Sequence, residues 1–322
     1  MKLSIIIPVY NTEKYLREYL NSCFDENAPE ENYEIICIDD GSTDYSPIIL
    51  KEYAERHSNL LIVRQANQGV SVARNHGITI ARGDWLWFVD SDDYIGKSAI
   101  SELLEIVSSP ENSTKESVEF PVGVFCDTES QNYCAKMLPG CIFSKLFLRK
   151  TLLDNNIFFF EKMSYGEDEM FNFVYRAHIQ ESLVLENKIF YFYRTNRAGS
   201  AMASFDFRKR FQSFETICVW LKSESAEKVF KSYAYRLHLY FYYINTILTE
   251  LLEQKRVIKS LYRLKKKGIL KIEAMGVADE RSHSLFFKLQ KNQSFVFSPQ
   301  KFIKKRAIAI SQFLKRKILK KQ

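Results

Sequence analysis

Residues 85–93 read Trp-Leu-Trp-Phe-Val-Asp-Ser-Asp-Asp, and this short stretch decides the fold. An uninterrupted apolar run of this length is typical of a strand that is buried on both faces, as in a parallel sheet. The run ends abruptly in a polar segment that is rich in carboxylates. Because ligands bind beyond the carboxyl ends of parallel strands, the stretch predicts an α/β fold with a polar site at residues 90–93.

The sequence before this stretch alternates between strand-like and helix-like patterns. Apolar, β-branched runs predict strands at 3–9, 34–38, 60–63 and 85–89. Helical spacing of apolar residues predicts helices at 13–24, 46–57 and 70–81, with another at 97–107. This β-α-β-α-β-α-β order predicts a doubly covered, Rossmann-like and mostly parallel sheet with helices on both faces.

The ends of the other predicted strands are polar as well. Tyr10 and Asn11 follow the first strand, and the second strand leads into residues 39–44, which read Asp-Asp-Gly-Ser-Thr-Asp. We expect these segments to meet residues 90–93 at one edge of the sheet.

Two further regions follow this α/β half. Residues 108–117 are polar and predict a loop, after which 143–155, 166–177 and 189–193 predict mixed helices and strands. Residues 205–322 predict an all-helical extension, whose aromatic stripe we expect to pack against the rest of the protein. The predicted domains are residues 1–204, made of the halves 1–107 and 108–204, and a basic helical region at 205–322.

Charge is distributed unequally along the chain. The net charge is +7, yet 20 of the 46 Lys and Arg residues lie in 255–322, beside only Glu273, Asp279 and Glu280. Apolar residues alternate with the basic ones there, which is typical of a helix on an anionic membrane surface, although a solvated helix or a frayed end explains the pattern too. No nucleic-acid-binding module accompanies the charge, so nucleic acid is not an expected partner.

Cysteine usage and the N-terminus favour the cytoplasm. The six cysteines contain no C-x-x-C pair, and Cys37 lies in a predicted strand, so we expect buried free thiols rather than disulfides or a metal site. The chain enters a strand at once without a secretory signal, and no run approaches about 18 uncharged apolar residues. We therefore expect a cytoplasmic protein at the inner face of the cell membrane. The five histidines are scattered and receive no role.

Asp90 and Asp92 have the spacing of ligands for a hard cation. Carboxylates two residues apart beyond a strand end suit Mg²⁺ or Mn²⁺ together with phosphate oxygens. Taken alone, the cluster is weak evidence for a metal site and is better explained as a turn and cap for the helix predicted at 97–107, because Asp is favoured at helix N-termini.

The cluster is one of several motifs that occur in a fixed order. Residues 4–11 read SIIIPVYN, 38–44 IDDGSTD, 67–77 NQGVSVARNHG, 83–84 GD and 166–172 GEDEMFN. In this order and spacing, residues 1 to about 200 resemble the family 2 glycosyltransferases of the GT-A fold. The resemblance implies a metal-dependent, inverting transfer of a sugar from a nucleotide diphosphate.

The resemblance also implies roles for residues at the donor site. Tyr10 and Asp40 match the positions that hold the base, usually uracil, by a ring face and by a carboxylate that accepts the base N–H. Asp92 matches the metal ligand that bridges to the diphosphate, and Asp90 a contact to the ribose or the metal shell. The remaining matched positions for nucleotide-sugar binding are Pro8, Asn11, Asn67, Arg74 and Ser91. On residue type alone, Tyr10 is also explained as a buried ring and Arg74 as a solvated helix residue.

Asp168 matches the general base of the family. Inverting transfer needs one carboxylate on the face of the sugar opposite the leaving group, where it takes the proton of the acceptor hydroxyl. Glu167 is the alternative base, and an acidic helix N-terminus after Gly166 is the structural alternative. Arg194 resembles the cation that closes over the diphosphate, and a structural surface arginine explains it equally.

Together these observations predict a cytoplasmic, membrane-associated glycosyltransferase. It would move a single sugar from a nucleotide-diphosphate donor, UDP-linked by resemblance, to a hydroxyl of a glycan or lipid-linked glycan in surface polysaccharide synthesis. The sequence lacks the P-loop and dinucleotide glycine motifs, and it lacks the Gln-x-x-Arg-Trp of processive synthases. A catalytically silent GT-A scaffold and a basic surface-binding adaptor are the competing hypotheses. The oligomeric state is open.

Overall fold

The computed structural model describes residues 1–25, 27–126, 133–138, 140–163 and 165–195, together with positions 212, 213, 216 and 220. The chain divides into two compact units, Met1–Ile217 and Cys218–Gln322. The predicted helical region, including its aromatic stripe and basic tail, lies almost wholly outside the described residues. The boundary at residue 204 therefore stays a prediction.

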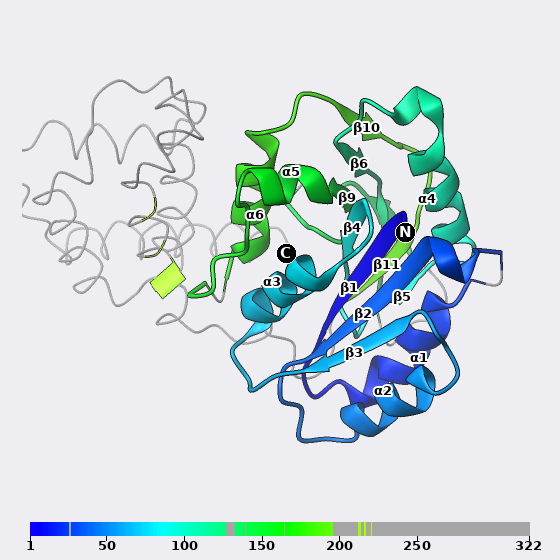
Figure 1. The fold of residues 1–322 in the computed structure, drawn as a ribbon, viewed down its shortest axis with the longest axis vertical. Helices are drawn as coiled ribbons and strands as arrows, with labels where there is room; N and C mark the ends of the chain where they lie inside the picture. The colour runs from blue at the N-terminus through cyan, green and yellow to red at the C-terminus, as the bar shows by residue number, and fades with distance from the viewer. Residues whose placement is uncertain are drawn as a thin grey trace, which may run out of the picture. The chain divides into compact units, whose positions relative to one another are not determined.

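A seven-stranded, mostly parallel sheet forms the centre of the first unit (Figure 1). Its strand order is β10-β6-β9-β4-β1-β2-β3, in which β9 alone runs antiparallel to its neighbours. The strands are β1 (Leu3–Val9), β2 (Tyr33–Asp39), β3 (Leu60–Arg64), β4 (Trp85–Phe88), β6 (Ser117–Glu119), β9 (Lys145–Leu148) and β10 (Ser182–Val184).

A smaller four-stranded sheet stands beside the first, with the order β5-β11-β7-β8. It consists of β5 (Tyr94–Ile95), β7 (Val122–Cys126), β8 (Cys134–Lys136) and β11 (Tyr191–Thr195). The helices are α1 (Glu13–Cys23), α2 (Ser46–Ala54), α3 (Val70–Ile80), α4 (Ala99–Ser108), α5 (Arg149–Asp154) and α6 (Glu167–Arg176), with short 3₁₀ turns at Glu30–Asn32 and Pro110–Asn112.

The two faces of the large sheet carry different cores because successive strand residues point to opposite sides. On one face, alternate residues of β1, from Leu3 to Val9, join a buried cluster with α1, α2 and α4. On the other face, the ring of Phe88 meets those of Phe147, Phe159 and Phe171. Burying both faces explains why the strands read as continuous apolar runs.

Helix α3 packs directly on the second face of β1. A Cβ at Gly77 of α3 would lie 2.3 Å from Cγ2 of Ile6. Glycine therefore lets the helix backbone approach the strand more closely than any other residue would. The N-terminal turns of α3 are thereby held at the edge where β1 ends.

Most elements lie where the sequence predicts them, with β1 matching at both ends. The stretch 143–155, predicted within a region of mixed strands and helices, divides into β9 and α5. The expected loop at 108–117 contains a 3₁₀ turn and ends at the start of β6. Among the described cysteines, Cys23 and Cys37 are buried, whereas Cys134 is exposed, so the expectation of buried thiols is wrong for that residue.

No helix in the described part of the chain combines the length and the apolar character needed to cross a membrane.

Candidate functional site

The first two strand ends are bound together by a small hydrogen-bond network. Val9 pairs in register with Asp39, so the segments that follow β1 and β2 start side by side. The backbone N–H of Asn11 donates to Oγ of Ser42 at 3.1 Å, and the side-chain oxygen of Asn11 accepts from the N–H of Thr43 at 2.8 Å. Pro8, in β1, is half-buried.

Tyr10 stands at this edge with its ring half in solvent. Its exposed fraction is 49%, so its alternative interpretation as an ordinary buried ring is wrong. An exposed aromatic face beside a polar loop is available for a base to stack on.

Asp40 is buried and holds the loop that joins β3 to α3. One carboxylate oxygen accepts from Nε2 of Gln65 at 2.8 Å and from the N–H of Gln68 at 2.9 Å. The other oxygen accepts from the N–H of Gly69 at 2.8 Å. Asn67, on the same loop, is exposed, and its backbone nitrogen would lie 2.9 Å from a Cβ on Gly41. The structure thus brings Asn67 against the Asp40 segment.

The 90–93 segment follows β4 at the same edge. The carboxyl of Asp90 is about one third exposed, whereas Ser91 and Asp92 are buried. Oγ of Ser91 donates to Oγ1 of Thr12 at 3.1 Å. Helix α4 begins after Ser98, beyond β5, so the interpretation of the Asp cluster as its cap is wrong.

Asp93 is a site residue that the sequence analysis missed. The hydroxyl of Tyr191 donates to its carboxylate at 2.6 Å, and the N–H of Arg194 donates at 2.7 Å. Burial raises the pKa of Asp93 to about 8, helped by repulsion from Asp90. These bonds attach the Asp segment to β11, which is about 100 residues later in the chain. No local sequence pattern indicates a contact of this kind.

Arg74 lies at the centre of the site. Its guanidinium donates to Asp168 at 2.8 Å and to Asp90 at 2.9 Å, and it lies 3.5 Å from Glu167. The side chain is only 4% exposed, so the interpretation of Arg74 as a solvated helix residue is wrong. Burial alone would lower the pKa of Arg74, but the three carboxylates outweigh it and raise that pKa. No described residue forms a hydrogen bond with its buried Nε.

Asp168 sits in the first turn of α6. The helix starts after Gly166, whose φ of 74° favours glycine, and its first turn carries three acidic residues. Burial raises the pKa of Asp168 to about 8, against the attraction of Arg74, while Glu167 and Asp90 add repulsion. Asp168 therefore lies at an acidic helix N-terminus, and Arg74 binds both it and Asp90.

Arg194 is buried rather than on the surface. Its Nε donates to the backbone oxygen of Asp92 at 2.9 Å, and Nη2 donates to Glu18 at 2.7 Å. The guanidinium also lies 4.9 Å from the ring centres of Tyr15 and Phe125. Arg194 thus supports the Asp92 backbone, and its interpretation as a surface arginine is wrong.

The donor set fits a hard divalent cation held jointly with a diphosphate. Mg²⁺ sites of this kind use one or two carboxylates and complete their shell with phosphate oxygens and water. Asp90 and Asp92 supply carboxylates at the strand end, and the surplus of carboxylates over arginines leaves negative charge for a cation to offset. No group of three or more His, Cys, Asp or Glu side chains within the described ranges forms a protein-only metal cage.

The chain is similar to known glycosyltransferases. Residues 4–115 match the model of Glycosyl transferase family 2. A poly(ribitol-phosphate) beta-glucosyltransferase of Bacillus spizizenii is 46% identical over 102 residues, which are 31% of this chain and 16% of that protein. The putative glycosyltransferase EpsH of Bacillus subtilis is 30% identical over 194 residues, 55% of each chain. The chain therefore spans no more than about half the length of these relatives.

A solved structure extends the likeness to the fold. The crystal structure of S. aureus TarS 1-349 in complex with UDP-GlcNAc aligns with a TM-score of 0.64 and 22% identity, covering 79% of this chain and 78% of that one. The predicted α/β fold with a mostly parallel central sheet is thereby confirmed.

Proposed function

We propose that the chain is a glycosyltransferase of family 2, whose model matches residues 4–115, and that it transfers a sugar from a nucleotide-diphosphate donor to a hydroxyl of a glycan acceptor. UDP is the proposed nucleotide. The relatives named above are glycosyltransferases by name, and two of those names or titles refer to poly(ribitol-phosphate) glucosylation and to UDP-GlcNAc. Surface polysaccharide synthesis is the proposed setting.

One observation carries the proposal more than any other. A single buried guanidinium, that of Arg74, contacts Asp90 after β4 and Asp168 in α6, which are 78 positions apart in the chain. The contact supports a site with a carboxylate for the donor side and another carboxylate for proton transfer. Inverting transfer needs the second of these roles, a carboxylate that takes the proton of the acceptor hydroxyl.

In the proposed reaction, Asp168 accepts the proton of the acceptor hydroxyl as that oxygen attacks the anomeric carbon. The new carbon–oxygen bond forms on one face of the sugar while the bond to the nucleotide diphosphate breaks on the other, so the configuration inverts. Tyr10 and Asp40 hold the base side of the donor. Pro8, Asn11, Asn67 and Ser91 complete its predicted surroundings, and Arg194 orders the Asp92 backbone.

Asp90 and Asp92 are the proposed ligands for Mn²⁺ or Mg²⁺. When bound, such an ion neutralises the negative charge that grows on the departing diphosphate. The protein's own contribution is to hold these two carboxylates at the end of a rigid strand.

The acceptor and the location are proposed more broadly. We expect one sugar to be added per encounter, to a glycan or a lipid-linked glycan. The basic residues after 254 would bring the enzyme to the inner membrane surface by attraction to anionic lipids.

The direct test is an Asp168→Asn variant with Glu167→Gln as its matched control. Release of UDP from UDP-GlcNAc and UDP-glucose is measured with and without candidate glycan acceptors, and UDP binding is measured separately. We expect Asp168→Asn to lose transfer by a factor of about 10³ while UDP still binds, because a general base contributes roughly 10² to 10⁴. Glu167→Gln should retain most of the activity. Near-normal turnover by Asp168→Asn would contradict the proposed base.

One observation favours the competing hypothesis of a silent scaffold. Arg74 binds one carboxylate oxygen of Asp168 at 2.8 Å, and this ion pair gives Asp168 a structural role that needs no catalysis. Donor binding without UDP release by the wild-type protein, under every acceptor tried, would support that scaffold.

A further inference from the structure

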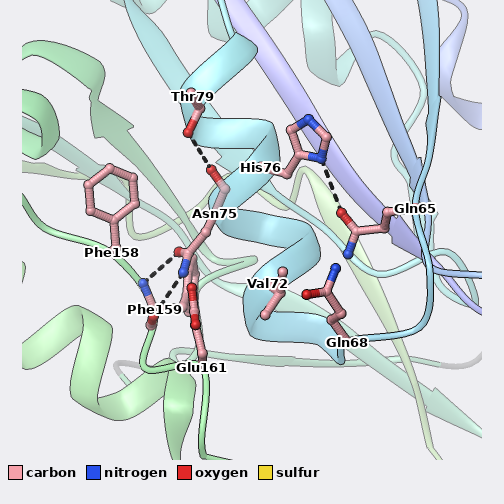
Figure 2. Close-up of a pocket in the computed structure, with 9 residues that line it drawn as sticks. All are labelled: Gln65, Gln68, Val72, Asn75, His76, Thr79, Phe158, Phe159 and Glu161. Carbon is pink, nitrogen blue, oxygen red and sulfur yellow. Dashed lines mark hydrogen bonds between the residues drawn. The ribbon is translucent and has the colours of Figure 1, made fainter.

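A groove of about 600 Å³ runs along α3 (Figure 2). One wall is the helix itself, with Val72, Asn75 and Thr79 at successive turns. The segment 158–161 forms the opposite wall, and the loop after β3 closes one end. We call this feature the α3 groove.

Its lining mixes polar and apolar side chains, and the described residues that line it include neither Lys nor Arg. The amide of Gln68 and the carboxylate of Glu161 have no hydrogen-bond partner within the described part of the chain, and both residues are exposed. The ring of Phe158 is half-buried beside them. Amides, a carboxylate and a ring face are groups that bind hydroxyls and the apolar faces of sugar rings.

His76 adds a third polar group of defined orientation. Asp40 only accepts, so the Gln65 amide donates to it and turns its oxygen toward Nδ1 of His76, 3.1 Å away. In the neutral ring, Nδ1 is then the donor and Nε2 is an acceptor. Asp40, a residue of the proposed donor site, thereby fixes through Gln65 the tautomer of His76, which lines the groove.

The groove is also connected to the proposed base. Asn75 binds the backbone of Phe159 twice, donating to its oxygen at 2.9 Å and accepting from its N–H at 2.8 Å. The Phe159 ring lies 5.3 Å from the guanidinium of Arg74 and stacks on Phe171 at 3.9 Å. Arg74 in turn holds Asp168. A ligand in the groove would therefore lie one layer of side chains from the proposed chemistry.

We propose that the α3 groove binds an uncharged oligosaccharide, the part of the glycan acceptor that extends beyond the reacting sugar. That this oligosaccharide is part of the acceptor rests on the proposed function. The prediction that the groove binds it does not. The absence of Lys and Arg from the lining, together with the charge of Glu161, disfavours a phosphate-rich or otherwise anionic polymer. A volume of about 600 Å³ is ordinary for a ligand site.

The test uses the full chain and four defined tetrasaccharides. Cellotetraose, maltotetraose and tetra-N-acetylchitotetraose are uncharged, and tetragalacturonate is the anionic counterpart. Binding is measured by saturation-transfer NMR and calorimetry on the wild type, Glu161→Lys and Phe158→Ala. Glu105→Lys, an equal charge reversal at an exposed position of α4, is the matched control, and UDP binding is measured on every variant.

We expect at least one uncharged tetrasaccharide to bind the wild type and tetragalacturonate to bind more weakly. Glu161→Lys and Phe158→Ala should each weaken the neutral ligand by about tenfold or more, which is about 1.4 kcal/mol. Glu105→Lys should behave as wild type. UDP binding should survive in all variants, which also shows that they fold.

Three results would overturn the inference. The first is that no uncharged tetrasaccharide binds. The second is that the groove variants bind the tetrasaccharide as well as the Glu105→Lys control does. The third is that tetragalacturonate binds more tightly than the uncharged tetrasaccharides. If UDP binds while the groove results fail, the proposed function stands without the groove. If tetrasaccharides bind but UDP does not, the groove stands and the proposed function fails.

Discussion

At the scale of single residues, Arg74 shows how one buried cation can organise a site. One terminal nitrogen of Arg74 binds Asp90 and the other binds Asp168. The guanidinium also lies over the ring of Phe159, which restricts the side chain to this orientation. Removing one partner of a buried ion pair leaves the other charges uncompensated, which costs more than the pair contributes. We therefore expect Arg74 to contribute to local stability, apart from its proposed role in donor binding.

An Arg74→Met variant tests this. It keeps the length of the side chain but leaves the carboxylates without their cation, so we expect the free energy of unfolding to fall by about 3 kcal/mol. Urea denaturation measures the change. Arg17→Met is the control, since Arg17 makes an exposed pair with Glu52, and we expect its loss to lower the free energy of unfolding far less than Arg74→Met does. Equal, small losses for both variants would show that the Arg74 contacts contribute little.

The raised pKa of Asp168 gives a second expectation at this scale. A general base acts in its deprotonated form, and burial raises the pKa of this carboxyl to about 8. The rate of transfer at low donor concentration should therefore rise with pH until about 8, rather than level off near the pKa of an ordinary carboxyl. A pH profile that is already flat at about pH 6 would contradict that environment for Asp168.

At the scale of elements, α3 is the helix that positions the site. Gly77 lets the helix approach Ile6 of β1 closely. Asp40 accepts hydrogen bonds from the loop that precedes the helix, and the middle turn carries Arg74. The orientation of the helix thus sets the distance between the donor side and the proposed base.

Gly77→Ala should disturb this arrangement despite the better helix propensity of alanine. The added Cβ would fall 2.3 Å from a branched methyl of a fully buried isoleucine, which has nowhere to move. We expect a net destabilisation of about 1–3 kcal/mol in denaturant titrations. Thr79→Ala, on the exposed side of α3, should change stability by less than about 0.5 kcal/mol. A stabilised Gly77→Ala protein would show that the helix is not tightly seated.

Sequence patterns predict the helices and strands that have a clear local periodicity of apolar residues. They miss features that depend on contacts with residues far away in the chain. The first half follows a regular alternation, so β1, α1 and α3 lie close to where their periodicity places them. The 143–155 stretch divides because β9 pairs with β4 and β6, which only the folded chain brings together. Likewise the motifs indicate Asp90, Asp92 and Asp168, but nothing local indicates that Arg74 joins them or that Asp93 is bound by Tyr191.

At the scale of the whole molecule, charge is the feature that separates the two ends of the chain. The residues after 254 are strongly basic and the rest are acidic in balance. A lipid-linked acceptor would make such an arrangement useful, because each Lys or Arg near an anionic surface contributes about 1 kcal/mol to binding.

Removal of residues 255–322 tests the membrane proposal. Full-length chain should co-sediment with vesicles that contain anionic lipid and be released as salt is raised, while the truncated chain should stay in solution. Neutral vesicles are the control for nonspecific binding. Undiminished sedimentation of the truncated chain would place the membrane contact elsewhere.

The most direct test of the account as a whole is calorimetry of UDP binding with and without Mn²⁺, on the wild type and on Asp92→Asn. We expect UDP to bind the wild type in a way that depends on Mn²⁺, and we expect Asp92→Asn to lose this dependence, because Asp92 is a proposed ligand to the ion. UDP binding that is unchanged by Mn²⁺ or by the substitution would contradict the assignment of the donor site.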